Sequence, residues 1–446
     1  MAVYTKSKSY APSNIWAYWQ ALEPLKAGIW LFFFLLIFDG ALRKWVLPQL
    51  ATPLLVINSP VAIWLLYRAF QKGVVKVNGY IFTIWATGAI SFVASILVGH
   101  HHVLVAAYGL RILWIFFPLM FVIGKVFTRE DIIKLGEIVL YISLPMLLIV
   151  LWQFFTPDSA WISRGIGGTG TASFPGVLGY GRPSGTFSFN NGNALFWSLC
   201  APFVFYFWLS PGRINRVLLW AATGALIAAV PLSVSRGLFY HAAITVLFAL
   251  GILARKPKYL GRFLLAAAGI GVLFILLSNT YYVQKALHVF TVRFTSASAS
   301  EGGAVQGTLI HRFLGGLVRP FVHSSHIPFL GYGLGMGTQA GAKLLTGSRG
   351  FMISEGEWGR LIGEMGLLLG SIVILSRLAF VVQIGWGSLK KIKSGTILPW
   401  LLFSVAGITV LTSQWSQPTV LGFSTLLGGL VLASLREPKQ GNAFSK

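Results

Sequence analysis

The chain has 446 residues, of which 55% are hydrophobic and 10% are charged, and its mean hydropathy is +0.74. A soluble domain of this size needs more charge to cover its surface, so the composition excludes a soluble globular fold. Lys and Arg outnumber Asp and Glu by 35 to 11, and the single cysteine, Cys200, excludes an intrachain disulfide.

Apolar runs of about 20 residues recur along the chain, which is the length that crosses a hydrocarbon core of about 30 Å. We therefore predict an all-α polytopic membrane protein forming a single integral domain over 1–446, with the first apolar run retained because no signal-peptide pattern precedes it. The twelve predicted spans are 27–47, 50–69, 79–99, 103–124, 132–156, 190–209, 216–233, 238–254, 261–278, 357–381, 396–414 and 418–435.

The connections between these spans alternate in charge. One set, which includes both termini, holds 21 Lys and Arg residues and is predicted to be cytoplasmic by the positive-inside rule. The opposite set contains a first outer loop, 157–189, and a long outer loop, 279–356. Within the long loop, apolar residues recur with helical spacing over 308–322, which predicts a helix lying along the membrane surface.

Several cations fall on the predicted outer side, where the positive-inside rule does not explain them. They are Arg164, Arg182, Arg236, Lys285, Arg293, Arg312, Arg319, Lys343 and Arg349. Arginine presents a planar fork suited to paired phosphate oxygens, so we predict a diphosphate site at the outer leaflet. The alternative is that these arginines contact lipid phosphates or pair with carboxylates.

Two short stretches place such an arginine beside a span. GRPSGTFSFNNGNALF (181–196) carries Arg182 and then asparagines, among them Asn191, where a helix enters the membrane. Polar groups at that depth cost free energy unless they bind a ligand or are hydrogen-bonded, so they are candidates for a binding site. The alternative is that the asparagines cap the helix. SVSRG (233–237) repeats the pattern with Arg236.

Acidic residues are scarce enough to consider one by one. Asp39 precedes Arg43 by one helical turn, which predicts an intramembrane ion pair. Glu355, Glu357 and Glu364 cluster where the long loop re-enters the membrane, so a general base facing the outer leaflet is predicted there. Capping of the helix N-terminus by Glu355 and Glu357 is the alternative.

The histidines and glycines give weaker indications of a functional site. Consecutive imidazoles in 100–102 point in different directions, and no outer Cys or Asp completes a set, so no metal site is predicted there. His323 and His326 are possible substrate contacts in the long loop. GYGLGMG (331–337) follows no βαβ pattern, and we interpret it as a tight turn beneath the surface helix rather than a nucleotide loop.

These features together resemble the superfamily of O-antigen ligases and Wzy-type polysaccharide polymerases. The resemblance lies in the twelve-span pattern, the long loop between the ninth and tenth spans, RPSGTFSFNNGNA, SVSRG, and the loop ending in GYGLGMG and EGEWGRLIGEMG. It implies a GT-C-like glycosyltransferase in the bacterial inner membrane, with its active site facing the periplasm and no cofactor or metal.

The resemblance also implies the ligands and the residues that bind them. The donor would be an undecaprenyl-diphosphate-linked oligosaccharide and the acceptor a second glycan, with membrane lipids and other envelope polysaccharide-assembly proteins as further partners, and no nucleic acid. Arg182, Arg236 and Arg312 would bind the diphosphate, and Arg319, His323, His326 and Asn191 would contact substrate. Relatives commonly carry His nine residues before the Glu of Glu-x-Gly, where this chain has Glu355, so Glu355, with Glu357 behind it, is the predicted base unless His323 or His326 replaces it.

Three alternative functions remain open at this level. An O-antigen ligase would use the same donor and join the glycan to lipid A core or another acceptor. A lipid-linked oligosaccharide flippase would place its ionisable residues near mid-membrane and show related halves, and this sequence shows no related halves. The third is a non-catalytic partner in an envelope assembly complex.

Overall fold

The computed structural model describes residues 15–168, 170, 174–255, 257–301, 315–322, 324–348 and 350–436. Its α-helices are α1 (Ile15–Ala41), α2 (Asn58–Gln71), α3 (Gly79–Leu97), α4 (Val103–Arg111), α5 (Phe117–Val126), α6 (Arg129–Phe155), α7 (Asn190–Leu209), α8 (Arg216–Leu232), α9 (Arg236–Arg255), α10 (Leu260–Ser278), α11 (Tyr281–Glu301), α12 (Gly315–Val322), α13 (Gln339–Thr346), α14 (Glu357–Lys393), α15 (Leu398–Thr412) and α16 (Pro418–Leu435). Two short strands, β1 (Phe174–Val177) and β2 (Tyr180–Arg182), pair antiparallel, with Phe174 opposite Arg182 and Val177 opposite Tyr180.

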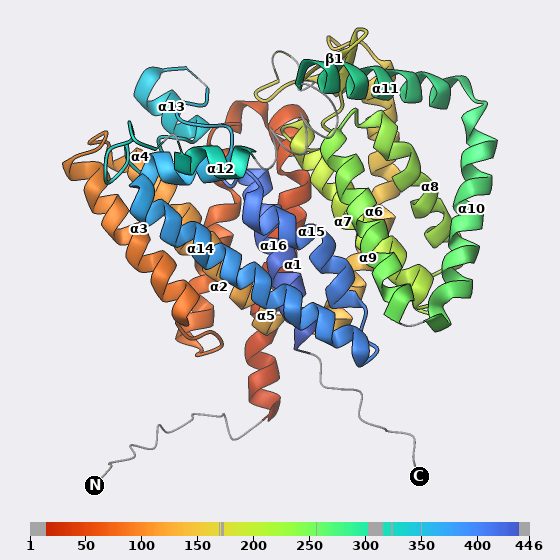
Figure 1. Ribbon diagram of the computed structural model, residues 1–446, viewed down its shortest axis with the longest axis horizontal. Helices are drawn as coiled ribbons and strands as arrows, with labels where there is room; N and C mark the ends of the chain where they lie inside the picture. The colour runs from red at the N-terminus through yellow and green to blue at the C-terminus, as the bar shows by residue number, and fades with distance from the viewer. Residues whose placement is uncertain are drawn as a thin grey trace.

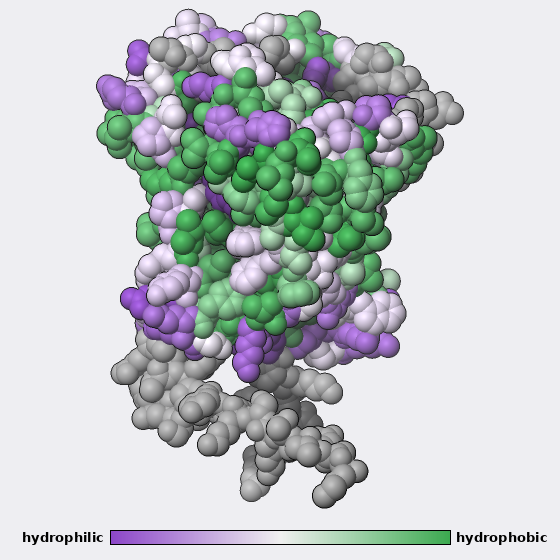
Figure 2. Space-filling model, turned by 90° about the vertical axis from the view of Figure 1, so that its left-hand side faces the viewer, coloured by the Kyte–Doolittle hydropathy of each residue, from purple (hydrophilic) through white to green (hydrophobic). Residues whose placement is uncertain are grey.

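The helices identify an all-α multi-pass membrane protein. Over the described ranges, nine helical segments are long and apolar enough to cross a membrane: Leu22–Val46, Pro53–Gln71, Gly79–Leu97, Val103–Val126, Arg129–Phe155, Asn190–Leu209, Arg236–Arg255, Glu357–Lys393 and Pro418–Leu435. A broad apolar band separates polar side chains at the two ends of the molecule (Figure 2). The predicted fold class is confirmed at this level, because the band has the character of a surface in contact with lipid.

The other three predicted spans are less regular. Helices α8 and α15 coincide with the predicted spans 216–233 and 396–414 but fall short of the spanning length. The apolar part of α10 is followed by α11 at an angle of 103° between Phe263–Leu276 and Tyr281–Ser296. Helix α11 occupies the start of the predicted long loop, where the sequence pattern did not predict a helix.

The two predicted outer loops meet at one end of the molecule. Helix α1 begins and α16 ends at the bottom of Figure 1, whereas β1, α11, α12 and α13 lie at the top. Of the predicted surface helix over 308–322, residues 315–322 are helical, and 308–314 lie outside the described residues. Phe321 of α12 meets Trp358 of α14 edge to face, with ring centroids 5.9 Å apart, so α12 is fastened to α14.

Helix α16 forms the centre of the bundle and packs against α5, α7 and α15. Nearly all of its side chains are buried. Gly428 and Gly429 face Met120 and Ile123 of α5 so closely that a Cβ atom would lie 2.4 and 2.6 Å from these side chains. Small residues permit such close helix approach within a membrane, where van der Waals packing drives helix association.

Candidate functional site

Helix α14 is two helices joined at Gly366, where φ is 77° and ψ is 169°. The Arg377 guanidinium reaches the Glu357 carboxylate at 2.7 Å, although the two residues are 20 apart in sequence. In a straight helix they would lie about 30 Å apart, so the chain reverses at Gly366. The predicted span 357–381 is therefore wrong in its limits: the short half, 357–365, is too short to cross, and the long half, 367–393, is about 40 Å long.

The predicted turn 331–337, here called the glycine segment, packs against this reversal. The N–H groups of Tyr332 and Gly333 donate to the carbonyls of Gly363 and Glu364 at 2.8 and 3.1 Å, which satisfies acceptors at the end of the short half. A Cβ on Gly366 would lie 1.9 Å from the Phe329 carbonyl oxygen. Glycine is thus required at position 366 both by its φ and by the close approach of another backbone.

Replacing Gly366 by alanine is expected to lower the free energy of unfolding by about 3 kcal/mol, because the strained φ and the backbone overlap both oppose a Cβ atom. Thermal unfolding of the purified protein in detergent measures the change. Gly271→Ala on α10 is the control, since a Cβ there meets nothing within 4 Å. Equal melting temperatures for the two variants would contradict the requirement for glycine at position 366.

Four buried charged side chains, here called the charge network, hold the two halves of α14 together. Arg360 donates from Nε and Nη2 to Glu357 at 3.0 and 2.8 Å and from Nη1 to Glu364 at 2.6 Å, and Arg377 adds its 2.7 Å bond to Glu357. All four side chains are 3% exposed or less. Two positive and two negative charges balance, which is the condition under which charges are tolerated away from water.

The charge network also fixes two neighbouring segments. Glu364 accepts the Gly337 N–H at 2.8 Å and so binds the glycine segment. Glu357 accepts the Trp415 N–H at 3.0 Å, and the Arg377 guanidinium lies 3.8 Å from the centroid of the Trp415 ring. Trp415 belongs to residues 414–417, here called the dividing turn, which is closed by a 3.1 Å bond from the Gln417 N–H to the Gln414 carbonyl.

A cavity of about 1070 Å³, here called the Glu355 cavity, lies on one side of the dividing turn. It brings together three predicted site residues, Glu355, Arg319 and His326, with Gln414 of the dividing turn. The Glu355 side chain is exposed, and no hydrogen bond or ion pair to its carboxylate is seen over the described part of the chain. Its main-chain carbonyl accepts a hydrogen bond from the Gln414 side chain. A carboxylate so placed is free to accept a proton from a bound hydroxyl.

A second cavity of about 520 Å³, here called the Arg43 cavity, lies on the other side of the dividing turn. Its wall includes Arg43, Asn191, Lys343 and Gln417. Arg43 is 4% exposed and donates to the Ala51 carbonyl at 2.8 Å and to the Ser188 hydroxyl at 2.9 Å, so its guanidinium is held at the cavity wall. Lys343 on α13 is exposed. Two cations therefore face a semi-enclosed space at the outer-loop end.

The two cavities are linked by a chain of side-chain amides. Asn191 donates to Gln417 at 3.1 Å, Gln417 donates to Gln414 at 2.6 Å, and Gln414 donates to the Glu355 carbonyl. The asparagine-capping alternative is not supported, because α7 begins without a side-chain capping bond. For Asn191, the structure instead shows a role in positioning the dividing turn.

The segment RPSGTFSF (182–189) is packed by bonds from distant residues. Lys44 donates to the Ser184 hydroxyl and the Gly185 carbonyl at 3.0 and 2.7 Å, and Asn193 donates to the Pro183 carbonyl at 3.1 Å. Because Lys44 is 1% exposed, these bonds keep its charge satisfied. The segment thus forms a rigid wall behind the Arg43 cavity.

The predicted site residues are distributed unevenly. Arg319, His326 and Glu355 meet in one cavity, and Asn191 lines the other. Arg182 and Arg236 are half-buried and line neither cavity. Arg312 and His323 lie outside the described residues. Glu357 lies in the first turn of α14, where a negative charge is favourable, although it makes no side-chain capping bond. It is buried and bonded to two arginines and to the Trp415 N–H, so its position suits it to hold the dividing turn and not to act as an exposed base.

Sequence reasoning missed several residues that build this region. Arg43 was considered only as a partner for Asp39. Asp39 is buried, and its Oδ1 has no hydrogen-bond partner in the described ranges. The position of Arg43 is explained by its bonds to Ala51 and Ser188, without the predicted ion pair to Asp39. Arg360 lies between Glu357 and Glu364 at i+3 and i−4, a spacing that predicts their ion pairs from sequence. Nothing local indicates Arg377.

Comparisons with protein-family models and with curated proteins find no match for this chain.

Proposed function

We propose that this protein is a glycosyltransferase that transfers a glycan from an undecaprenyl-diphosphate-linked donor to an acceptor glycan and so polymerises O-antigen or exopolysaccharide repeat units. One observation carries the proposal: a cavity walled by Arg43 and Lys343 and a cavity walled by Glu355 lie on opposite sides of the dividing turn. A donor with an anionic leaving group and an acceptor with a hydroxyl need such a pair of neighbouring sites.

The chemistry follows from the two cavities. The acceptor hydroxyl oxygen attacks the anomeric carbon of the donor while the bond from that carbon to the diphosphate oxygen breaks. The proton passes to the Glu355 carboxylate, and the electron pair of the broken bond leaves with the diphosphate. Arg43 and Lys343 stabilise the negative charge on the leaving group, as fixed cations do where charge develops. Arg319 and His326 supply donors for the acceptor sugar.

The proposal includes the finer topology implied by the resemblance. Twelve spans would give a GT-C-like bundle in the bacterial inner membrane, with both termini cytoplasmic and the long outer loop in the periplasm. The grouping of β1, α11, α12 and α13 at one end supports a shared outer face for both cavities (Figure 1). A transporter would place its binding groups near mid-membrane, and the position of both cavities near that end favours an enzyme.

A reconstituted assay tests the function. The purified protein in proteoliposomes is given undecaprenyl-diphosphate glycan with either a second donor molecule or lipid A core oligosaccharide as acceptor. Chain extension supports a polymerase, and transfer to the core alone reassigns the protein as a ligase. Movement of intact donor across the bilayer with no new glycosidic bond would overturn the enzyme proposal.

The cations of the Arg43 cavity give a separate prediction. Lys343→Gln is expected to lower kcat/KM for the donor about tenfold, because one cation facing the leaving diphosphate is lost at a solvent-exposed position. Lys76→Gln, at the opposite end of the bundle, is the control. Arg182→Ala and Arg236→Ala serve as comparators. If they abolish transfer while Lys343→Gln has no effect, the diphosphate is bound by the arginines that the resemblance implies.

A further inference from the structure

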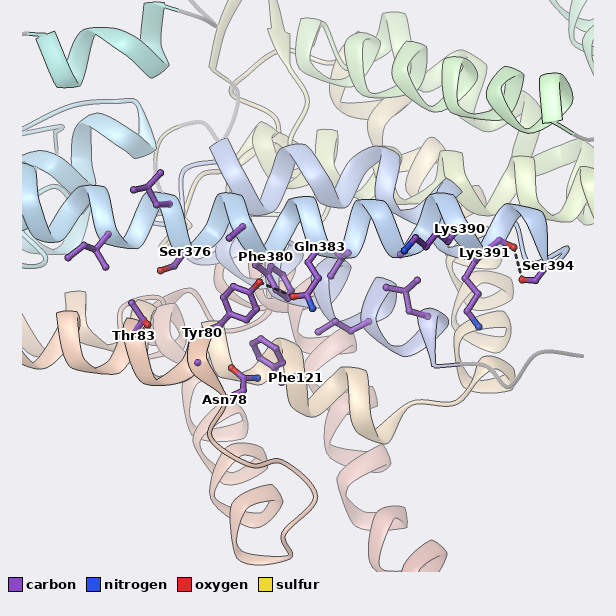
Figure 3. A pocket seen from close by; sticks show the side chains of 18 residues that line it. Asn78, Tyr80, Thr83, Phe121, Ser376, Phe380, Gln383, Lys390, Lys391 and Ser394 are labelled. Atoms are coloured by element: carbon purple, nitrogen blue, oxygen red, sulfur yellow. Dashed lines mark hydrogen bonds between the residues drawn. The ribbon is translucent and has the colours of Figure 1, made fainter. Parts of the chain in front are cut away.

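A third hollow, here called the lateral groove, opens on the side of the bundle between α3 and α14 and has a volume of about 1130 Å³ (Figure 3). Its floor includes Phe121 of α5 and Leu432 of α16. Its volume exceeds the roughly 300–1,000 Å³ usual for small-molecule sites. It shares no lining residue with the Glu355 or Arg43 cavities, so it is independent of the proposed function.

Polarity changes along the lateral groove. Apolar side chains, including Ile372, Leu375 and Phe380, line the part nearer the Gly366 break. Lys390, Lys391 and Ser394 line the far end, where Figure 3 shows them beyond Gln383 on α14. The groove is thus mostly apolar with a cationic end, which is the complement of an acyl chain bearing an anionic head.

The residues at the cationic end of the groove are typical of the depth at which lipid headgroups lie. The Lys390 ammonium lies 5.4 Å from the ring centroid of Trp386, whose side chain is 60% exposed. Tryptophan and lysine side chains are enriched at the membrane–water interface. Ala379 lies eleven residues before Lys390 and also lines the groove, about 16 Å away along the helix axis. That distance is close to half of a hydrocarbon core of about 30 Å, or one leaflet.

Two of the polar side chains that line the groove, Tyr80 and Asn78, have hydrogen-bond partners in the protein. The Tyr80 hydroxyl donates to the Gln383 side chain at 2.8 Å across the groove, and Asn78 caps α3 by accepting the Ile81 N–H at 3.0 Å. These bonds lower the free-energy cost of placing a hydrocarbon chain beside Tyr80 and Asn78. Lys390 and Lys391 are the cations that line the groove, and both lie at its far end.

We propose that the lateral groove binds an anionic phospholipid of the leaflet at the lysine-rich end of the bundle, with the headgroup phosphate at Lys390 and Lys391 and one acyl chain along α14. Each lysine near an anionic headgroup contributes on the order of fivefold in affinity, so the pair gives a preference on the order of 30-fold over a zwitterionic lipid. Bound lipid would lie between α3 and α14, and both halves of α14 contribute to the charge network.

Native mass spectrometry of the detergent-purified protein titrated with phosphatidylglycerol or phosphatidylcholine tests this proposal. The wild type is expected to prefer phosphatidylglycerol roughly 30-fold, and the double variant Lys390→Gln/Lys391→Gln is expected to lose most of that preference. The control Lys72→Gln/Lys76→Gln removes two lysines from the loop between α2 and α3, outside the groove, and is expected to keep it. Equal losses in both double variants would overturn the specific site and leave only a general attraction of basic loops for anionic lipid.

Two further measurements exclude other occupants. Ala379→Trp fills the acyl part of the groove and is expected to weaken phosphatidylglycerol binding at least fivefold while leaving both lysines in place. Soluble glycerol phosphate at millimolar concentration is not expected to compete, because it lacks the acyl chain. Competition by it, full binding by Ala379→Trp, or a dimer of this chain in place of bound lipid would each contradict the proposal.

Discussion

Glu355→Gln is expected to lower the rate of glycan transfer by about 10²- to 10⁴-fold, the range that general base catalysis contributes. The amide keeps the size of the side chain but cannot accept the acceptor hydroxyl's proton. Stability should change little, because the Glu355 side chain is exposed and its described hydrogen bond to Gln414 uses the main-chain carbonyl. The turnover number in the reconstituted assay and the melting temperature measure the two quantities separately.

Two variants make that result specific. Asp158→Asn removes another exposed carboxylate, just after α6, and is expected to retain full transfer. His326→Gln tests the imidazole that lines the Glu355 cavity. If Glu355→Gln transfers at the wild-type rate while His326→Gln does not, then His326 is the base and Glu355 only shapes the cavity.

Arg360→Met is expected to lower the free energy of unfolding by about 3–5 kcal/mol, the cost of leaving a buried charge without its partner. Arg360 is the only residue of the charge network that bonds to both carboxylates, and all four members are almost fully buried. Its loss leaves Glu357 and Glu364 with Arg377 alone. Thermal unfolding in detergent, followed by the loss of helical signal, measures the change.

A second substitution should partly reverse that loss. In Arg360→Met/Glu364→Gln the remaining pair, Glu357 and Arg377, is again neutral, and the glutamine oxygen can still accept the Gly337 N–H. We expect the double variant to be more stable than Arg360→Met alone by at least about 1 kcal/mol. Additive destabilisation would show that the network contributes through packing and not through charge balance.

The two predictions are connected, because the charge network supports the segments that line the cavities. The charge network has no exposed face, yet it holds the dividing turn through Trp415 and the glycine segment through Gly337. These two segments help to line the cavities where the proposed chemistry occurs. Gln414 and Met336 line the Glu355 cavity. Gln417 lines the Arg43 cavity, as does Gln339, which lies just after the glycine segment. Rigid support of this kind is what keeps reactive groups within the small tolerances that catalysis requires.

The sequence by itself determined the class of protein. Membrane spans are local features, because about 20 apolar residues in a row meet the thickness of the bilayer whatever the rest of the chain does. The outer arginines and the cluster Glu355, Glu357 and Glu364 were also visible locally, and they indicated the end of the molecule where the Glu355 and Arg43 cavities lie. The burial of Glu357 and Glu364 and the pairing of Glu357 with Arg377 were not visible, since they depend on residues distant in sequence.

Only the tertiary structure decided how the candidate site is built. The bond from Arg43 to Ser188 joins residues 145 apart, and the bond from Asn191 to Gln417 joins residues 226 apart. The pairing of Glu357 with Arg377 exists because Gly366 breaks the helix that the hydropathy pattern predicts to be continuous. A glycine in an apolar run does not reveal its φ, and a positive φ there is imposed by the glycine segment packed against it. For that reason the exposed Glu355 and the buried Glu357, two residues apart, have roles that only the fold separates.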